Sequence, residues 1–454
     1  EFHNTRLPIK DVDFEVFDMI PEHLEQIFDE MNIQWKVVGN GFPVYEVRFD
    51  SEPCQVSIPR RERKTGEGYM GFETSVDPHM SIRDAARRRD FTINAIYCDP
   101  LTGDVFDPYD GITDINFKRL KPVSKRFKED PLRVLRGMRF AAQMGLYPVT
   151  HTSKGGFIKI VQTAAQEIHT IPSDRMWREM EKLFLSPYPH MGFEYLRELD
   201  ILWIFPSVKA LIGVPQNPKH HPERFAYEHT LQTMQAMRHI IDTARSNGEV
   251  ISQEDEIVLM TTMLMHDIAK PITTYIKNNK WSSPGHAEAG ETPTRVFLKM
   301  RQADGQKAKD VFTERVVELV KTHMRYINFL EASHPRTQVE NLANALVHNS
   351  VDMWIKVVCA DYSGRNADGF RGNIIIPEKL FEFANLVKEE QARVRVVPLI
   401  KGQHLLDRGL RPGPIFGKIL KSCEAAQIDK IFDDTNYLTW LDTNFDDLVK
   451  HNQV

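Results

Sequence analysis

The chain has 454 residues, of which 41% are hydrophobic and 27% charged, a balance typical of folded globular proteins rather than disordered ones. This length exceeds what one hydrophobic core usually organises, so we expect about two to four domains. The net charge of -5 argues against a uniformly basic nucleic-acid binder, although basic residues gather at 60–64, 83–89 and 118–139.

The four cysteines lie far apart and form no CxxC pair, which argues against a zinc ribbon or a disulfide framework. Uninterrupted apolar runs stay well short of the roughly 18 residues that a membrane span needs. The start, EFHNTRLPIK, carries no signal-peptide core. We therefore expect a cytoplasmic protein with no membrane partner.

Strand-like segments alternate with polar turns through the first part of the chain. They cover residues 12–17, 35–38, 44–49 and 55–58, and a helical stretch lies around residues 21–31. This pattern predicts a small α/β sheet domain.

From about residue 130 the pattern becomes helical, and strands are not expected to return. Leu132, Leu135, Met138, Phe140 and Met144 have the spacing of one buried helical stripe. Proline-rich breaks divide the helical part further. We predict an α+β protein in which an N-terminal α/β sheet domain is followed by all-α domains, with the parts at residues 1–120, 121–205, 206–390 and 391–454.

Two aspartates open the first candidate site. Asp11 and Asp13 are separated by one residue, so a strand places both carboxylates on the same face. Paired carboxylates of this kind hold the Mg²⁺ ions that phosphoryl transfer uses. Taken alone, the pattern is more typical of an exposed acidic strand edge than of a metal site.

Arginine-rich segments follow the two aspartates. In RRRDFTINAI, the arginines and the adjacent Asp90 suit a triphosphate and a ribose hydroxyl. In EDPLRVLRGMRFA, Asp130 is placed to cap a helix on which arginines recur every three residues. The alternative interpretation is a solvated helix end for the first segment and a structural network of ion pairs for the second. Between the two segments, DPYDGITDI predicts a turn that packs against the sheet.

In this order, DVD, RRDFTINAI, DPYDGITDI and EDPLRVLRGMRFA resemble the class II tRNA nucleotidyltransferases (CCA-adding enzymes) and the bacterial poly(A) polymerases. The resemblance covers nearly all of the first 180 residues. It implies a nucleotidyltransferase domain at residues 1–120 in which Asp11 and Asp13 bind the catalytic Mg²⁺, and a neck at 121–205. It implies that the incoming nucleotide is bound by Arg89, Asp90, Glu129, Asp130, Arg133, Arg136 and Arg139.

Two features depart from the family pattern. The family carries a Gly-Gly-x-Val-Arg-Asp segment before the two aspartates, and this sequence has no match to it. Because TRLPIKD resembles the end of that segment and the chain does not begin with Met, we expect the natural protein to start further upstream. Gln55 stands where relatives often have an acid, so we expect two metal-binding carboxylates rather than three. Residues 59–72 resemble the family's mobile loop.

Histidines and aspartates form a second candidate site at residues 206–390. His266 and Asp267 are adjacent after an apolar run, which puts two ligands beside one metal, and His229 and Asp361 can complete the set. The same region also supplies His286. Imidazole and carboxylate ligands together suit Ni²⁺, Mn²⁺, Co²⁺ or Mg²⁺. A lone histidine on an apolar helix would more often be a core residue.

The order of these residues resembles the HD phosphohydrolase superfamily, and GVPQNPKHHPE resembles the junction that precedes the HD domain in CCA-adding enzymes. The combined resemblance implies template-independent addition of CMP and AMP, from CTP and ATP, to the tRNA 3′ end. It also implies a phosphatase or 2′,3′-cyclic phosphodiesterase activity in the HD domain, with Ni²⁺, Mn²⁺ or Co²⁺ as its metal.

Other functions remain open from the sequence. An A-adding, CC-adding or poly(A)-adding enzyme would share these motifs. The alternative from a different class is an HD phosphohydrolase whose nucleotidyltransferase domain has decayed. The sequence also leaves open whether the protein forms an oligomer.

Overall fold

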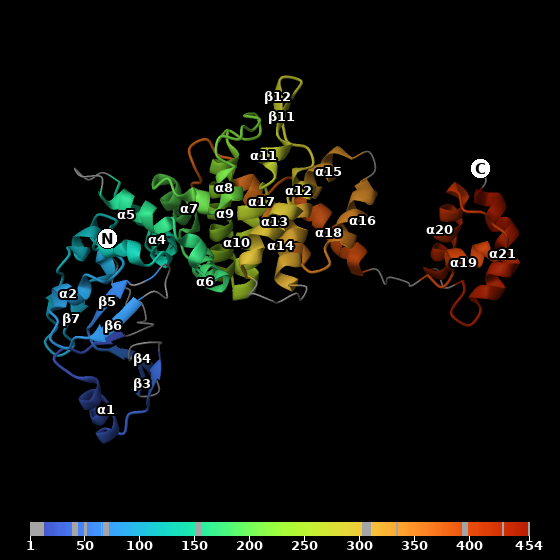
Figure 1. Ribbon diagram of the computed structural model, residues 1–454. Coiled ribbons are helices and arrows are strands. Elements are labelled where there is room, and N and C mark those ends of the chain that lie inside the picture. The colour runs from blue at the N-terminus through green and yellow to red at the C-terminus, as the bar shows by residue number, and fades with distance from the viewer. Residues whose placement is uncertain are drawn as a thin grey trace. The chain divides into compact units, whose positions relative to one another are not determined.

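The computed structural model describes residues 13–38, 44–49, 52–64, 66, 72–150, 156–301, 310–332, 335–392, 398–428 and 431–452. Contacts within the chain divide it into two compact units, Glu1–Ala384 and Asn385–Val454. Strands gather at the start of the first unit and helices dominate the rest of that unit, as Figure 1 shows. The predicted α+β class is confirmed.

A four-stranded sheet forms the core of the N-terminal region. Its order is β1–β4–β3–β2. The edge strand β1 runs parallel to its neighbour β4, and the other neighbouring strands are antiparallel. Helix α1 packs Leu24 and Phe28 against the buried Tyr45, Val47 and Val56. The predicted bounds of β2 and β3 are correct, whereas β1 is shorter and β4 begins earlier than expected. The elements are β1 (Asp13–Glu15), α1 (Pro21–Glu30), β2 (Trp35–Val38), β3 (Val44–Phe49) and β4 (Glu52–Ser57).

An antiparallel hairpin replaces part of the loop expected at residues 59–72. Strand β5 (Arg60–Lys64) pairs with β6 (Phe72–Val76), from Arg60 opposite Val76 to Lys64 opposite Phe72. The prediction of a loop is therefore wrong for 60–64. The charged sequence RRERK lacks the apolar alternation that marks a strand. It is a strand because its backbone pairs with FETSV, which the local pattern does not reveal. Residues 65 and 67–71 lie outside the described residues.

The turn predicted at DPYDGITDI is confirmed. Both carboxylate oxygens of Asp107 accept backbone N–H groups, from Gly111 at 2.7 Å and Ile112 at 2.9 Å. A Cβ at Gly111 would lie 2.2 Å from the Thr92 carbonyl oxygen, so only glycine fits. The surrounding elements are α2 (Ile82–Ala86), η1 (Thr92–Asn94), β7 (Tyr97–Cys98), β8 (Val105–Phe106), α3 (Gly111–Asn116) and β9 (Arg119–Leu120).

Helix α4 (Leu132–Met144) is central to the neck and packs against α6 (Ser173–Phe184) and α7 (Pro189–Glu198). The predicted stripe is buried at its first three positions, but Met144 is exposed, so the prediction is wrong at the end of the helix. The neck also contains η2 (Lys125–Glu129), β10 (Tyr147–Pro148), α5 (Gly156–Ala165), η3 (Ile168–Thr170) and η4 (Leu202–Ile204), and α8 (Pro206–Lys209) follows it.

The next helices surround α10 (Gln253–Met265), whose residues are all buried from Glu256 to Met265. Helices α9 (Ala226–Ser246), α14 (Val311–Thr322) and α17 (Val351–Ser363) pack against it. This burial on all sides explains the apolar run in the sequence. The remaining elements are α11 (Lys270–Thr273), α12 (His286–Ala289), α13 (Glu291–Leu298), η5 (Lys299–Arg301), α15 (Arg325–Glu331), α16 (Pro335–Ala345) and α18 (Leu380–Ala392).

A short hairpin leaves this helical region, contrary to the expectation that strands do not return. Strands β11 (Tyr275–Lys277) and β12 (Lys280–Ser282) pair antiparallel and project from the helices near α11 and α12 (Figure 1). Asn278 and Asn279 both have positive φ, of 50° and 57°, as a two-residue hairpin turn requires. Its strands of three residues are too short for a periodic signal.

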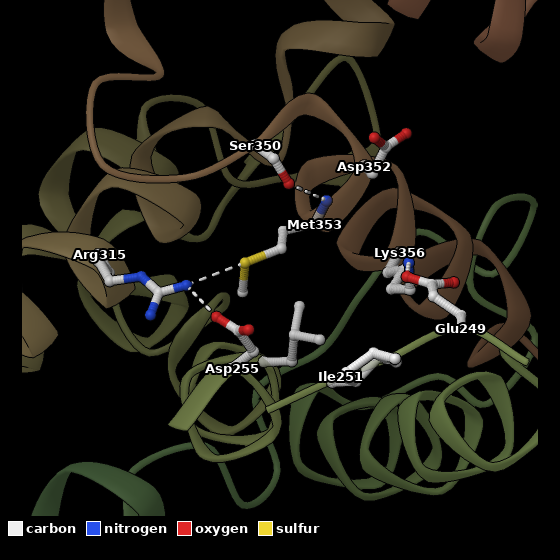
Figure 2. Close-up of a pocket in the computed structure, with 10 residues that line it drawn as sticks. Glu249, Ile251, Asp255, Arg315, Ser350, Asp352, Met353 and Lys356 are labelled. Carbon is white, nitrogen blue, oxygen red and sulfur yellow. Dashed lines mark hydrogen bonds and ion pairs between the residues drawn. The ribbon is translucent and has the colours of Figure 1, made fainter. Parts of the chain in front are cut away.

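A cavity of about 270 Å³ lies among α10, α14 and α17 (Figure 2). Its charged side chains are engaged with one another, because Arg315 pairs with Asp255 and Lys356 pairs with Glu249 at 2.6 Å. Figure 2 shows Arg315 also directed at the sulfur of Met353. These pairs join α14 to α10 and α17 to the loop before α10, so we assign the cavity a structural role.

The second unit has its own small core. It is built by Ile400, Leu405, Ile419, Cys423 and Leu441, with further partly buried apolar side chains around them. Its helices are α19 (Gly402–Leu406), α20 (Pro414–Ile428) and α21 (Tyr437–Asn452). Among the helices of the described residues, none combines the length and apolar character needed to cross a membrane.

Candidate functional site

The first candidate site begins at β1. Asp13 is exposed and lies in register with Gln55 on the parallel strand β4. An amide therefore stands beside the carboxylate, as the sequence predicted for Gln55. Asp11 lies outside the described residues, so the predicted pairing of Asp11 with Asp13 stays a prediction.

Glu15 is a site residue that the sequence analysis missed. It lies two residues after Asp13, on the same face of β1. Its carboxylate accepts hydrogen bonds from Arg88, from Arg89 at 3.3 Å and from the Tyr97 hydroxyl at 2.7 Å. Burial alone would raise the pKa of Glu15, but Arg88 and Arg89 outweigh it and hold that pKa below the usual range. Glu15 therefore fixes two arginines close to the exposed aspartate.

Asp90 joins the sheet domain to the neck. Its carboxylate is buried, accepts from Arg136 at 2.6 Å, and also accepts from Asn94 and from the backbone N–H of Phe91. Burial raises the pKa of Asp90, but Arg136 and these hydrogen bonds more than offset the effect, and the pKa lies below its usual range. The structure thus brings together two of the residues predicted to bind nucleotide.

The other predicted nucleotide-binding residues lie around the start of α4. Asp130 precedes the N-cap residue of α4, Pro131, and accepts the backbone N–H of Leu132 at 2.9 Å, while Glu129 ends η2 half-buried. The guanidinium of Arg133 donates to the carbonyls of Arg126 and Arg88, at 2.8 and 2.7 Å.

Arg139 takes part in a buried ion pair. Its Nε lies 2.7 Å from an Oε of Glu179 on α6, and the two side chains are only 11% and 9% exposed. This contact fits the alternative interpretation of a structural ion pair. The predicted role of Arg139 in binding nucleotide stays a prediction.

The second candidate site is a cluster of buried histidines and aspartates. His229 Nε2 lies 2.9 Å from Asp361 Oδ1, and His266 Nε2 lies 3.2 Å from Asp267 Oδ2. His229 Nε2 is 3.8 Å from Asp267 Oδ2, and His266 Nε2 is 3.9 Å from Asp361 Oδ1. The structure therefore brings all four predicted metal ligands together, from α9, the end of α10 and α17.

Two further histidines extend this cluster. His286 Nε2 lies 3.2 Å both from Asp267 Oδ1 and from His323 Nε2. The sequence analysis noted His286, but it missed His323, which follows α14 as a single histidine without a neighbouring acid. Asp267, His286 and His323 are one of the groups able to hold a metal, so Asp267 faces histidines on two sides.

Two cations balance the carboxylates. Lys270 lies 2.6 Å from Asp267 Oδ2, and Arg365 lies 2.6 Å from Asp361 Oδ2. Burial raises the pKa of both aspartates, but the neighbouring histidines and these cations hold each pKa well below its usual range. Both carboxylates are thus kept in the ionised form that a metal ligand needs.

The tautomers of three histidines follow from their hydrogen bonds. His266, His286 and His323 each direct Nδ1 at a backbone carbonyl, at 2.8, 2.7 and 2.6 Å. Because a carbonyl only accepts, Nδ1 carries a proton in each ring, and in the neutral form of the ring the lone pair is then on Nε2. His266 Nε2 is buried without a hydrogen-bond partner. An orphaned ring nitrogen among carboxylates fits a divalent metal.

The pKa values of two histidines are compatible with binding of a metal. Burial lowers the pKa of His323 to about 3, so its ring is neutral at pH 7. Burial would also lower the pKa of His229, but its hydrogen bonds to Asp361 and Glu223 outweigh this and raise it to about 9. A metal bound at His229 Nε2 would therefore replace a proton.

Comparison with known proteins identifies the family. Residues 4–121 match the poly A polymerase head domain, 158–212 a probable RNA- and SrmB-binding site of polymerase A, and 226–346 the HD domain. The chain is 33% identical over 356 residues to a multifunctional CCA protein of Actinobacillus pleuropneumoniae serotype 5b (strain L20), covering 77% of this chain and 78% of the relative. The chain belongs to the multifunctional CCA protein family.

Other members and solved structures agree. A multifunctional CCA protein of Haemophilus ducreyi is 29% identical over 408 residues, which covers 84% of this chain and 95% of that protein. A CCA-adding enzyme in complex with CTP has a TM-score of 0.51 at 15% identity, over 97% of this chain and 88% of that chain. The corresponding complex with ATP has a TM-score of 0.51 at 14% identity, over 95% and 84%. At such identities these structures show the fold.

Membership of the CCA protein family confirms the resemblance predicted from the motifs. It joins a nucleotidyltransferase head to an HD domain in one chain, as the order of DVD, RRDFTINAI and the His-Asp pair indicated. The roles of individual residues in either site stay predictions.

Proposed function

We propose that this chain adds CMP and AMP, from CTP and ATP, to the 3′ end of tRNA in the cytoplasm. The observation that carries the proposal is the 33% identity to a multifunctional CCA protein over 77% of the chain. The RNA 3′ hydroxyl would attack the α-phosphate of the nucleotide, its proton would pass to solvent, and pyrophosphate would leave.

Asp11 and Asp13 would hold Mg²⁺ at the reacting phosphate. When bound, Mg²⁺ polarises the α-phosphate and neutralises charge on the leaving pyrophosphate. The exposure of Asp13 on β1 supports this role. Glu15, which is buried, would not bind metal but would hold Arg88 and Arg89 where the triphosphate needs positive charge.

The neck would select the base. Glu129, Asp130 and Arg133 offer carboxylate acceptors and guanidinium donors, which together match the edges of cytosine and adenine. Arg136, which is paired with Asp90, would set the position of these residues against the head. Arg139 would reach the nucleotide only after leaving Glu179, so its contribution to binding would be small. The basic neck would hold tRNA through its backbone and shape.

A second activity is proposed for the HD domain, on the observation that His266 Nε2 is buried and unpartnered among carboxylates. His229, His266, Asp267 and Asp361 would hold Ni²⁺, Mn²⁺ or Co²⁺. Such an ion supplies a hydroxide from bound water at neutral pH. The substrate would be a phosphomonoester or a 2′,3′-cyclic phosphate. Attack of water on phosphorus would release an alcohol and inorganic phosphate from the phosphomonoester. In the cyclic phosphate it would break one ring P–O bond and leave one free ribose hydroxyl beside a phosphomonoester.

One experiment tests both activities. The natural full-length protein is incubated with tRNA lacking CCA, Mg²⁺ and labelled CTP or ATP, and in parallel with 2′,3′-cyclic AMP and Ni²⁺. We expect ordered CCA addition, which the double variant Asp11→Ala/Asp13→Ala loses. We also expect hydrolysis of the cyclic phosphate, which Asp267→Ala loses and the double variant keeps. If the protein adds only A, only CC or long A tails, the proposed CCA addition is wrong and that other activity takes its place. Hydrolysis without any nucleotide addition would favour an HD phosphohydrolase with a decayed nucleotidyltransferase domain.

A further inference from the structure

The loop that precedes α9 reaches into the HD cluster. It carries the sequence GVPQNPKHHPE and is closed where Pro215 bridges to Phe225 and the backbone N–H of Gln216 donates to the Arg224 carbonyl at 2.8 Å. Arg224 has a positive φ of 72°, which turns the chain into α9. This closed loop brings Glu223, which belongs to neither predicted site, against His229.

The carboxylate of Glu223 is almost fully buried, and one of its oxygens contacts two imidazole rings. Its Oε1 lies 2.8 Å from Nδ1 of His229 and 2.8 Å from Nδ1 of His221. The side chains of Glu223 and His229 are 1% and 0% exposed. Because a carboxylate only accepts, Nδ1 of His229 carries the proton and Nε2 faces Asp361.

His229 differs in this respect from the other histidines of the cluster. His266, His286 and His323 each use the carbonyl of the residue three positions earlier in the chain. His229 lies in the first turn of α9, where the Phe225 carbonyl already accepts its backbone N–H, and the nearest carbonyl to Nδ1 is that of Gly364 at 3.3 Å. The shorter and charged contact is the one to Glu223.

We infer that Glu223 is a positioning residue of the HD metal site, which holds His229 through Nδ1 so that Nε2 faces the metal. The inference rests on the metal site proposed above. A carboxylate on the far nitrogen of a ligand histidine fixes its orientation and makes the ring a stronger donor. Removal of such a partner weakens metal binding by about 10–100-fold.

The test measures metal binding without any substrate. Full-length protein is stripped of metal with a chelator and titrated with Ni²⁺ by calorimetry, and Co²⁺ absorption bands report the ligand geometry. We expect Glu223→Gln to raise the Ni²⁺ Kd about 10–100-fold and to alter the Co²⁺ bands. The matched control Glu288→Gln removes an exposed carboxylate two residues after His286 and is expected to leave both unchanged.

Retention of CCA addition and of the metal-free unfolding temperature shows that Glu223→Gln is folded. If it does not fold, Glu223→Asp keeps the charge and retracts the carboxylate by one carbon, and the same increase in Kd is expected. A Kd within twofold of the natural protein in the folded variant would overturn the inference. A second Ni²⁺ ion lost with Glu223 would also overturn it, because Glu223 would then be a ligand itself. If the natural protein binds no divalent metal, the proposed HD site itself fails.

Discussion

At the scale of single residues, the contact between Asp90 and Arg136 connects head and neck through one buried carboxylate. The two groups lie 2.6 Å apart, with Asp90 6% and Arg136 35% exposed. We predict that Arg136→Met lowers the free energy of unfolding by about 1–3 kcal/mol, because it leaves a buried charge unpaired; breaking a fully buried pair costs more, but Arg136 is partly screened by solvent. Urea unfolding at pH 7 measures the change.

The same pair predicts how this difference depends on pH. The pKa of Asp90 is depressed in the folded protein, so its stabilisation is complete above the unfolded value of about 3.9 and is lost as pH falls through the folded pKa. The difference between Arg136→Met and the natural protein should therefore shrink between pH 5 and the acid limit of the fold. A difference that grows as the pH falls would contradict this assignment.

The sequence was sufficient to find site residues where several ionisable side chains lie close together in the chain. His266 and Asp267 are adjacent, and the arginines of α4 recur at fixed spacing, so both sets were found. Glu15 and His323 were missed because each stands alone in the sequence and acquires partners only through contacts between distant segments. Glu223 lay in a motif that the sequence analysis used only as a family marker.

At the scale of elements, α4 and α6 are joined by the Arg139–Glu179 pair. We predict that Glu179→Leu alone costs about 3–5 kcal/mol, whereas the double change Arg139→Met/Glu179→Leu costs much less, because two apolar side chains can replace a buried ion pair of similar volume. A double-mutant cycle measured by urea unfolding gives the coupling. Additive effects of the two changes would show that the pair contributes nothing.

The contact of α4 with α7 depends on a glycine. A Cβ on Gly137 would lie 2.4 Å from the hydroxyl oxygen of Tyr195, in a part of the neck that is fully buried. We predict that Gly137→Ala lowers the unfolding free energy by about 1–3 kcal/mol through overpacking, despite the better helix propensity of alanine. Gly156→Ala, in the open space at the start of α5, is the matched control and should be neutral or slightly stabilising. Thermal unfolding of both variants compares them.

Local pattern decided which elements could be predicted. The strands β2 and β3 and the helix α1 have apolar side chains on one face and were placed within one residue. The hairpin β5–β6 was missed because charged residues fill β5, and the hairpin β11–β12 was missed because its strands of three residues are too short for a periodic signal. The bounds of α10 could not be placed from periodicity, because this helix is buried on every side from Glu256 to Met265.

At the scale of the molecule, the last unit has a separate core. Ile400, Leu405, Ile419 and Leu441 pack among themselves within Asn385–Val454. We predict that a chain ending after Ala392, which keeps α18, retains Ni²⁺ binding and hydrolysis of 2′,3′-cyclic AMP within about twofold of the full chain. Titration and a phosphate-release assay test this. A loss of metal binding would show that the HD site needs the last unit.

The HD ligands also have a consequence for how the protein is made. His229 and Asp361 lie 132 positions apart in sequence yet 2.9 Å apart in space. During synthesis, the head and neck leave the ribosome and can fold well before the last ligand emerges. If these residues hold a metal as proposed, the complete site would form only after Asp361 emerges, and the head and neck would fold without that metal.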